Sequence, residues 1–358
     1  MTNTTTSPLL PGRLGEPGRQ LGDDPRADPR LIAAMAPLGL EVEQPSPVDA
    51  TSPIDEIYAY CMEAETGFEQ LGGILAAASP RIVGIERSVE TITGVDGNEI
   101  TLYVHRPADV AGPLPAVVHT HGGGMVILTA ANAGYQRWRD ELAATGLVVI
   151  GVEFRNGAGV LGNHPYPAGL HDCTSATRWV AANRDELGVD RIVLSGESGG
   201  GNLALATALS ANRDGWIGEI AGVYAQCPYI SGAYADPPPA LTSLVENAGY
   251  LLSPDQLGAF ARAYDPDGSH ADDSLAWPLR AGRDDLAGLP PHVVSVNQLD
   301  PLRDEGLAFS GKLAAAGVSV VSRTVNGTCH AGDCLFRDAL PEVYLATIRD
   351  IRGFAASL

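Results

Sequence analysis

"RIVLSGESGGGNLALA", residues 191–206, joins an apolar run to a helix-forming run through a serine set among four glycines. Glycine is costly inside regular structure because it loses the most backbone freedom on folding, so this cluster indicates a sharp turn or a very close backbone approach. The five residues 196–200 fit the pattern G-x-S-x-G, with an expected strand before them and an expected helix after them. In that context the serine lies on a strained turn that pushes its Oγ into a cleft, which predicts that Ser198 is a nucleophile.

A glycine-rich turn of this kind can also bind a phosphate or serve only close packing, and both alternatives stay open at this point. The P-loop form of phosphate site is excluded, because no Lys-Ser or Lys-Thr pair follows the glycines. A nucleophilic serine needs a base and a set of oxyanion donors, so other parts of the chain must supply them.

Short apolar strands alternate with helical segments on both sides of this motif. The expected strands are 115–121, 147–154, 191–196, 220–226, 292–298 and 318–325, and the expected helices lie near 134–145, 171–187, 201–212, 303–316 and 342–356. Two further strands between 81 and 107 are joined through Asp96-Gly97, a common hairpin pair. This alternation is typical of βαβ units and predicts an α/β fold, with a central, mostly parallel sheet and helices on both faces.

Three stretches divide the chain. Residues 1–28 are rich in Pro, Gly and Thr and are expected to form an extended arm. Residues 29–80 hold two expected helices, the second starting with Ser52 as N-cap and Pro53 at the first helical position. The catalytic domain then covers 81–358, with an insertion at about 231–278. Because the insertion follows a strand, it lies where α/β sheets bind ligands, and we expect it to form a helical cap with the N-terminal helices.

The first strand after the hairpin ends in an HGGG sequence, residues 121–124. Glycines at this place offer unhindered backbone N–H groups to a tetrahedral intermediate. We therefore predict an oxyanion hole made by the amides of Gly123, Gly124 and Gly199, with His121 ordering the loop. The alternatives are a simple glycine turn and a metal pair formed by His119 and His121, for which no third ligand is evident.

The acid and the base should follow the serine in the order Ser, Asp, His. Asp300 comes directly after the strand 292–298, and His330 follows the strand 318–325. Asp304 is the rival acid, but it falls inside the expected helix start, and either aspartate could instead cap that helix. Metal binding by Cys329, His330, Asp333 and Cys334 is an alternative that lacks a second ligand pair at a recognisable distance, so free thiols are favoured.

Composition limits the partners of this 358-residue chain. It is 45% hydrophobic and 18% charged, with a net charge of −20, which indicates a soluble globular protein and disfavours nucleic acid. No apolar run is long enough to span a membrane, and the first residues lack the basic and apolar regions of a signal peptide. The five cysteines are an odd, sparse set that indicates reduced thiols and a cytoplasmic location. A homo-oligomer stays open.

The motifs HGGG (121–124), GESGG (196–200) and DPLRDEG (300–306), with the histidine that follows, resemble those of the bacterial hormone-sensitive-lipase-like esterases. The similarity runs from about residue 81 to the end, with a weaker echo near 28–78. It implies the α/β-hydrolase fold, and it favours Asp300 as the acid because the family uses the first Asp of its D-P-L-x-D run. Two departures are Glu197 and Gly199, where the family usually has Asp and Ala. A third departure is the segment 154–172, which is longer than the Y-R-L-A-P-E run that the family usually has at this place. This difference leaves the shape of the pocket unpredicted.

The resemblance implies a serine carboxylesterase that hydrolyses small-molecule esters or lactones through Ser198, His330 and Asp300 and an acyl-enzyme, without metal or organic cofactor. Likeness to one member of the family would imply a macrocyclic lactone as substrate. The alternatives are an amidase or thioesterase that uses the same triad, and a non-catalytic receptor. Plant gibberellin receptors resemble the same family but have lost the catalytic histidine, which this chain keeps.

Overall fold

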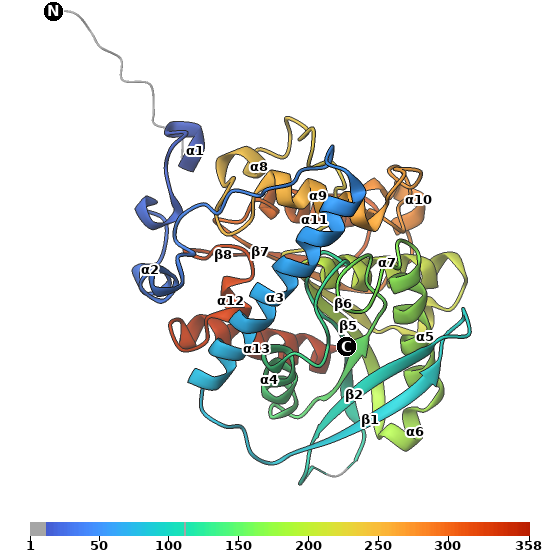
Figure 1. The fold of residues 1–358 in the computed structure, drawn as a ribbon. Coiled ribbons are helices and arrows are strands. Elements are labelled where there is room, and N and C mark those ends of the chain that lie inside the picture. Colours follow the sequence, from blue (N-terminus) through green and yellow to red (C-terminus); the bar gives the residue numbers. More distant parts are fainter. Residues whose placement is uncertain (1–11, 111) are drawn as a thin grey trace, which may run out of the picture.

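The computed structural model describes residues 12–110 and 112–358 (Figure 1). Within these residues, eight strands form one sheet in the order β1-β2-β4-β3-β5-β6-β7-β8. The strands are β1 Ile85–Thr93, β2 Glu99–Pro107, β3 Leu114–Thr120, β4 Val148–Glu153, β5 Val189–Glu197, β6 Gly222–Gln226, β7 His292–Asn297 and β8 Val320–Val325. Strand β2 pairs antiparallel with β1 and β4, and all other pairs are parallel. The predicted mostly parallel sheet is confirmed, and the six strands expected after the hairpin begin and end within two residues of their observed bounds.

Helices cover both faces of the sheet, because consecutive strand residues point to opposite sides. On one face Val117, Val149 and Val193 pack with α4 (Ala133–Ala143) and α13 (Pro341–Ser357). On the other face the next residues along the same strands, such as Val118, pack with α5 (Ala168–Ala182), α7 (Gly199–Arg213) and α11 (Arg303–Ala315). The strands β6 and β7 are buried along their whole length, which explains why they read as continuous apolar runs.

Two helices from distant parts of the chain lie against each other beside the sheet. Helix α3 (Ile54–Ala78) precedes the first strand, and α9 (Pro254–Tyr264) belongs to the segment between β6 and β7; they pack together, and α3 also contacts α4 (Figure 1). The expected start of α3 was wrong by one residue. Pro53 is its N-cap, because the Ser52 Oγ accepts a hydrogen bond from the Asp49 N–H of the preceding turn.

The remaining helices are short. They are α1 Gly12–Gly15, α2 Pro29–Met35, α6 Arg184–Leu187, α8 Ser243–Glu246, α10 Arg283–Leu286 and α12 Gly332–Leu335. The expected arm at 1–28 lies partly outside the described residues. From residue 12 it contacts α8, and the Arg26 guanidinium bonds to the carboxylates of Asp24 and Glu246.

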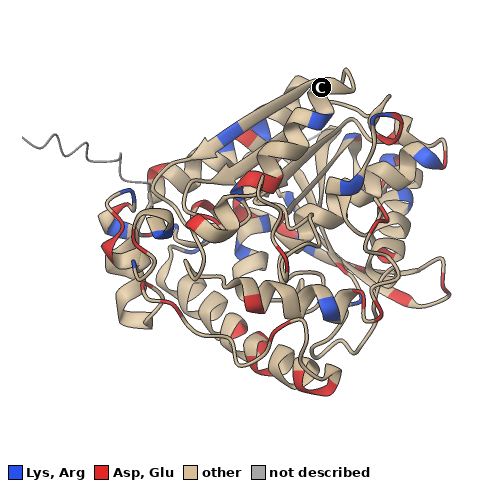
Figure 2. Ribbon diagram, turned by 90° about the horizontal axis from the view of Figure 1, so that it is seen from above, with Lys and Arg blue, Asp and Glu red and all other residues tan. Residues whose placement is uncertain are grey.

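Acidic side chains dominate the charged surface. Asp and Glu number 43 against 23 Lys and Arg. Figure 2 shows them distributed over helices and loops, with Lys and Arg dispersed among them. No helix in the described parts of the chain combines the length and the apolar character needed to cross a membrane.

Candidate active site

Ser198 sits at the corner between β5 and α7. Its backbone has φ +57° and ψ −121°, a strained conformation for a residue with a side chain. The Ser198 N–H donates to the Gln226 carbonyl oxygen at 2.9 Å, which ties the corner to the neighbouring strand. The glycines around it are required by space, because a Cβ at Gly196 would overlap the Gly200 carbonyl oxygen and one at Gly200 would overlap that of Thr120. The turn therefore has the geometry that presents a serine at the end of the sheet.

The HGGG loop meets the start of α7 beside this serine. Gly123 and Gly124 have φ of +97° and +63°. A Cβ on Gly199 would lie 2.7 Å from the Gly124 nitrogen, so the first residue of α7 and the loop are in close contact. The structure thus brings the three predicted oxyanion residues together, and Ser198 lines the same pocket as Gly123 and Gly124.

Substitution of Gly123 tests this close packing. Gly123→Ala is expected to lower kcat at least 100-fold, because its Cβ would collide with the Ile127 carbonyl oxygen and displace the predicted oxyanion amides. Gly97→Ala is the matched control: Gly97 also has a positive φ, +80°, but open space around it, so only about 1–2 kcal/mol of stability is lost. Ester hydrolysis and thermal unfolding are measured for both, and a fully active Gly123→Ala would contradict the assignment of this loop.

The Glu197 side chain binds the start of the HGGG loop. Its carboxylate accepts hydrogen bonds from the Gly122 N–H at 2.8 Å and pairs with the His119 Nε2 at 3.0 Å. His121 instead stacks on Phe154 at 4.2 Å, and its Nδ1 lies 2.8 Å from the Gly122 carbonyl oxygen. Burial lowers the pKa of His121 to about 3, so this ring is neutral. The two histidines therefore face different partners, and sequence reasoning missed the part that Glu197 plays.

His330 and Asp300 form a buried pair. The His330 Nδ1 lies 2.8 Å from the Asp300 Oδ2, and the Asp300 Oδ1 accepts the Leu302 N–H at 2.8 Å. Burial by itself lowers the pKa of His330, but the Asp300 carboxylate, with a smaller contribution from the neighbouring Cys227, outweighs it and raises the pKa well above 6.5. The rival Asp304 is directed elsewhere, since its carboxylate accepts hydrogen bonds from the Ser243 N–H and the Arg303 Nε.

A thiol that the sequence did not single out stands beside this pair. Cys227, Asp300 and His330 each offer a ligand-type atom, and these atoms lie within 4.8 Å of one another. Burial raises the pKa of the Cys227 thiol, so it packs here in its neutral form. The cysteine cluster considered as a metal site is arranged differently: the Asp333 carboxylate accepts from Asn297 and Thr347, and Cys334 lines the pocket.

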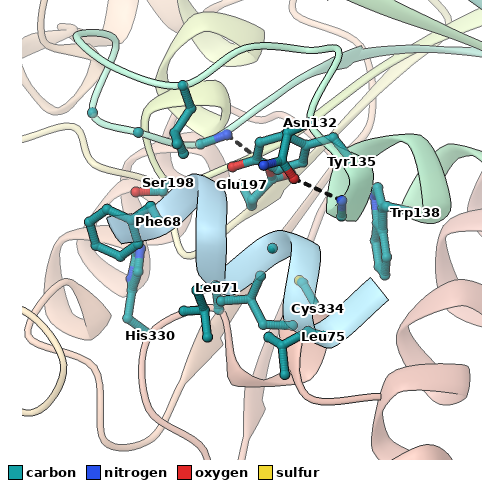
Figure 3. Close-up of a pocket in the computed structure, with 18 of the residues that line it drawn as sticks. Phe68, Leu71, Leu75, Asn132, Tyr135, Trp138, Glu197, Ser198, His330 and Cys334 are labelled. Atoms are coloured by element: carbon teal, nitrogen blue, oxygen red, sulfur yellow. Dashed lines mark hydrogen bonds between the residues drawn. The ribbon is translucent and has the colours of Figure 1, made fainter. Parts of the chain in front are cut away.

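A pocket that is partly open to solvent contains both Ser198 and His330. In Figure 3, Ser198, Phe68 and His330 lie toward one end and Trp138 toward the other. Helix α3 contributes Phe68, Leu71, Gly72, Leu75 and Ala76, and the segment with α9 contributes Leu252, Gln256, Leu257 and Phe260. The segment 154–172, all of it described, contributes no lining residue. It lies behind the HGGG loop, where the Gly157 and Ala158 N–H groups donate to the Met125 and Val126 carbonyls.

Comparison with known proteins agrees with this architecture. Residues 117–332 match a family described by its alpha/beta hydrolase fold, and the chain belongs to this family. Among solved structures it is similar to a brefeldin A esterase, described as a bacterial homologue of human hormone-sensitive lipase, with 47% identity, 98% of each chain covered and a TM-score of 0.94. It is also similar to the esterase Est22, with 37% identity, 94% and 99% coverage and a TM-score of 0.85.

A curated relative points in the same direction. The carboxylesterase NlhH of Mycobacterium tuberculosis (strain ATCC 25618 / H37Rv) is 36% identical over 246 residues, which cover 67% of this chain and 74% of NlhH. The predicted α/β-hydrolase fold and the resemblance to hormone-sensitive-lipase-like esterases are confirmed. The predicted class, carboxylic ester hydrolase, is confirmed as well. The family member whose likeness implied a macrocyclic lactone is the brefeldin A esterase.

Proposed function

We propose that this chain is a serine carboxylesterase whose nucleophile is Ser198. The observation that carries the proposal is the bonded pair of His330 and Asp300 opening on the same pocket as the strained corner of Ser198. The Ser198 Oγ attacks the ester carbonyl carbon while His330 accepts its proton. Asp300 fixes the imidazole tautomer, with the proton on Nδ1, and stabilises the imidazolium that forms.

The amides of Gly123, Gly124 and Gly199 would hold the negative oxygen of the tetrahedral intermediate. In comparable enzymes one such donor is worth roughly 3–4 kcal/mol. The intermediate expels the alcohol, which takes the proton from His330, and leaves an acyl group on Ser198. Water, deprotonated by His330, then attacks this acyl-enzyme; the acid leaves, and the Ser198 Oγ takes the proton back from His330. His330 makes every proton transfer in this sequence, so no metal or organic cofactor is required.

The pocket walls support a substrate with a sizeable apolar part. We infer that residues 29–80 and the segment 231–278 form a cap over the 81–358 domain, because α3 and α9 both line the pocket. Such a cap limits the access of water to the acyl-enzyme. Likeness to the brefeldin A esterase makes a macrocyclic lactone one candidate beside ordinary carboxylic esters.

All five cysteines are free thiols, which agrees with the expected cytoplasmic location.

Two measurements test the function together. A fluorophosphonate probe should label Ser198, and p-nitrophenyl esters graded by acyl length should be hydrolysed, with a macrocyclic lactone, an anilide and a thioester included in the same series. Ester turnover well above that of the anilide and the thioester is expected. An unlabelled protein without turnover would favour a receptor, and faster turnover of the anilide or thioester would favour the amidase or thioesterase alternative.

A further inference from the structure

Helix α3 carries a buried carboxylate that the catalytic scheme does not use. Glu65 is 2% exposed, and in the described part of the chain no Lys, Arg or His forms an ion pair with it. Burying a carboxylate away from any cation is expensive unless other groups satisfy it. The residues that bond to Glu65 therefore decide what it does.

Two backbone amides satisfy this carboxylate. The Leu128 N–H donates to the Glu65 Oε1 at 2.7 Å, and the Val160 N–H donates to the Oε2 at 2.7 Å. Hydrogen bonds to an ionised oxygen are about twice as strong as neutral ones. The two amides belong to two separate loops, the continuation of the HGGG loop and the segment 154–172, so Glu65 fastens both loops to α3.

The loop that Glu65 holds is strained. Beyond its two glycines, Met125 and Leu128 also have positive φ, +62° and +78°. Such conformations cost of order 1–3 kcal/mol for residues with side chains and persist only where the surroundings impose them. The Ile127 N–H donates to the Gly123 carbonyl oxygen at 3.1 Å. Because Ile127 directly precedes Leu128, a shift of Leu128 would also move the oxyanion glycines.

The next turn of α3 adds a second contact of the same kind. The Asn132 Nδ2 donates to the Glu69 Oε2 at 2.5 Å, while the Asn132 Oδ1 accepts the Gly134 N–H and caps α4. Between these two glutamates, Phe68 of the same helix lines the pocket. One helix thus contacts the substrate space and braces the loop.

We propose that Glu65 is a positioning residue, through which the cap helix α3 holds residues 123–128 in the conformation that aims the oxyanion amides. The inference rests on the proposed function. It gives the cap a role in the rate of the reaction, beyond shaping the pocket: a rigid loop keeps its donors in place before charge develops, which is what makes such donors effective.

Glu65→Gln is the test. An amide side chain sets an NH₂ group against one of the two N–H donors, so one hydrogen bond is lost and the loop relaxes. We expect kcat for p-nitrophenyl butyrate to fall about 10- to 100-fold, less than the 10²–10³ that loss of a whole donor costs, with KM changed less than about threefold. Affinity for a trifluoromethyl ketone, which forms a tetrahedral adduct with the serine, should fall by the same factor. Glu63→Gln, exposed on the same helix, is the matched control and should behave like the wild-type protein.

The results that overturn the inference are distinct. A Glu65→Gln variant with unchanged kcat, or with a raised KM alone, would show that Glu65 only shapes the pocket. Should this variant fail to fold, hydrogen exchange in the wild-type protein decides: slow exchange of the Leu128 and Val160 amides supports the brace, and fast exchange overturns it. A wild-type protein without esterase activity would count against the proposed function, whereas an active one whose variant keeps its kcat counts against this inference alone.

Discussion

Ser198→Ala is expected to lower kcat for p-nitrophenyl butyrate by about 10⁵- to 10⁶-fold, the scale seen when the nucleophile of a serine hydrolase is removed. Without the Oγ no acyl-enzyme forms, and only the residual rate from the oxyanion donors and substrate binding remains, about 10³–10⁴ above that in water. The rate is followed by p-nitrophenol release, and labelling by the fluorophosphonate should be lost in parallel.

Ser195→Ala gives this experiment a matched control. Ser195 lies three residues earlier on β5, and its Oγ is buried without a hydrogen-bond partner among the described residues. Removing an unsatisfied buried hydroxyl costs little stability. Normal activity in Ser195→Ala beside an inactive Ser198→Ala would localise the loss to the nucleophile. Substantial activity in a purified Ser198→Ala protein would refute the mechanism.

Asp300→Asn is expected to lower kcat about 10⁴-fold, as loss of the acid does in other triads, because an amide favours the wrong imidazole tautomer. The substitution also changes the pH dependence. His330 must be neutral to accept the serine proton, and Asp300 raises its pKa well above 6.5. The acidic limb of the kcat/KM profile should therefore lie above pH 6.5 in the wild-type protein, with activity rising as pH increases through it.

Removing the carboxylate charge takes away the largest of the causes that raise the His330 pKa. Burial alone lowers the pKa of His330, so the acidic limb of Asp300→Asn should move to lower pH even as the maximal rate collapses. Asp304→Asn should leave the limb in place, because that carboxylate bonds to Ser243 and Arg303 instead. A limb that moved in Asp304→Asn and stayed in Asp300→Asn would show that Asp304, and not Asp300, is the acid. The free energy of unfolding should change with pH in the opposite direction to the activity. The His330–Asp300 pair stabilises the fold fully below pH 6.5, and this stabilisation is lost as pH rises through the folded-state pKa of His330.

Much of the fold and the main site candidates followed from local patterns in the sequence. Strands buried on both faces leave unbroken apolar runs, so β3 to β7 were found with nearly correct bounds. The corner at Ser198 and the loop at Gly123 need glycine for steric reasons, and such positions are visible in the sequence alone. Asp300 and His330 could be proposed because both follow strands that end at the same edge of the sheet.

The residues that sequence reasoning missed are defined by contacts across the chain. Glu65 bonds to an amide 63 residues away, and Glu197 bonds to a loop 75 residues before it. A glutamate on a helix resembles any exposed acid until the fold buries it. Cys227 was likewise one cysteine among five, and only the meeting of β6 with the loops after β7 and β8 sets it beside His330. A signal that could have pointed to Glu65 is its place on the apolar side of α3, in line with Ile57 and Cys61.

Helix α3 stands before the first strand, yet it walls the pocket and fastens the strained loop. A chimaera that grafts this N-terminal region of one such esterase onto the body of another would therefore transplant turnover together with selectivity. A donor helix with a neutral residue at the position of Glu65 should give a chimaera with a low kcat, even when the apolar residues of that helix fit the new substrate. Variant libraries confined to Leu71 and Leu75 would change which esters are accepted and would leave the hydrogen bond between Glu65 and the Leu128 N–H in place.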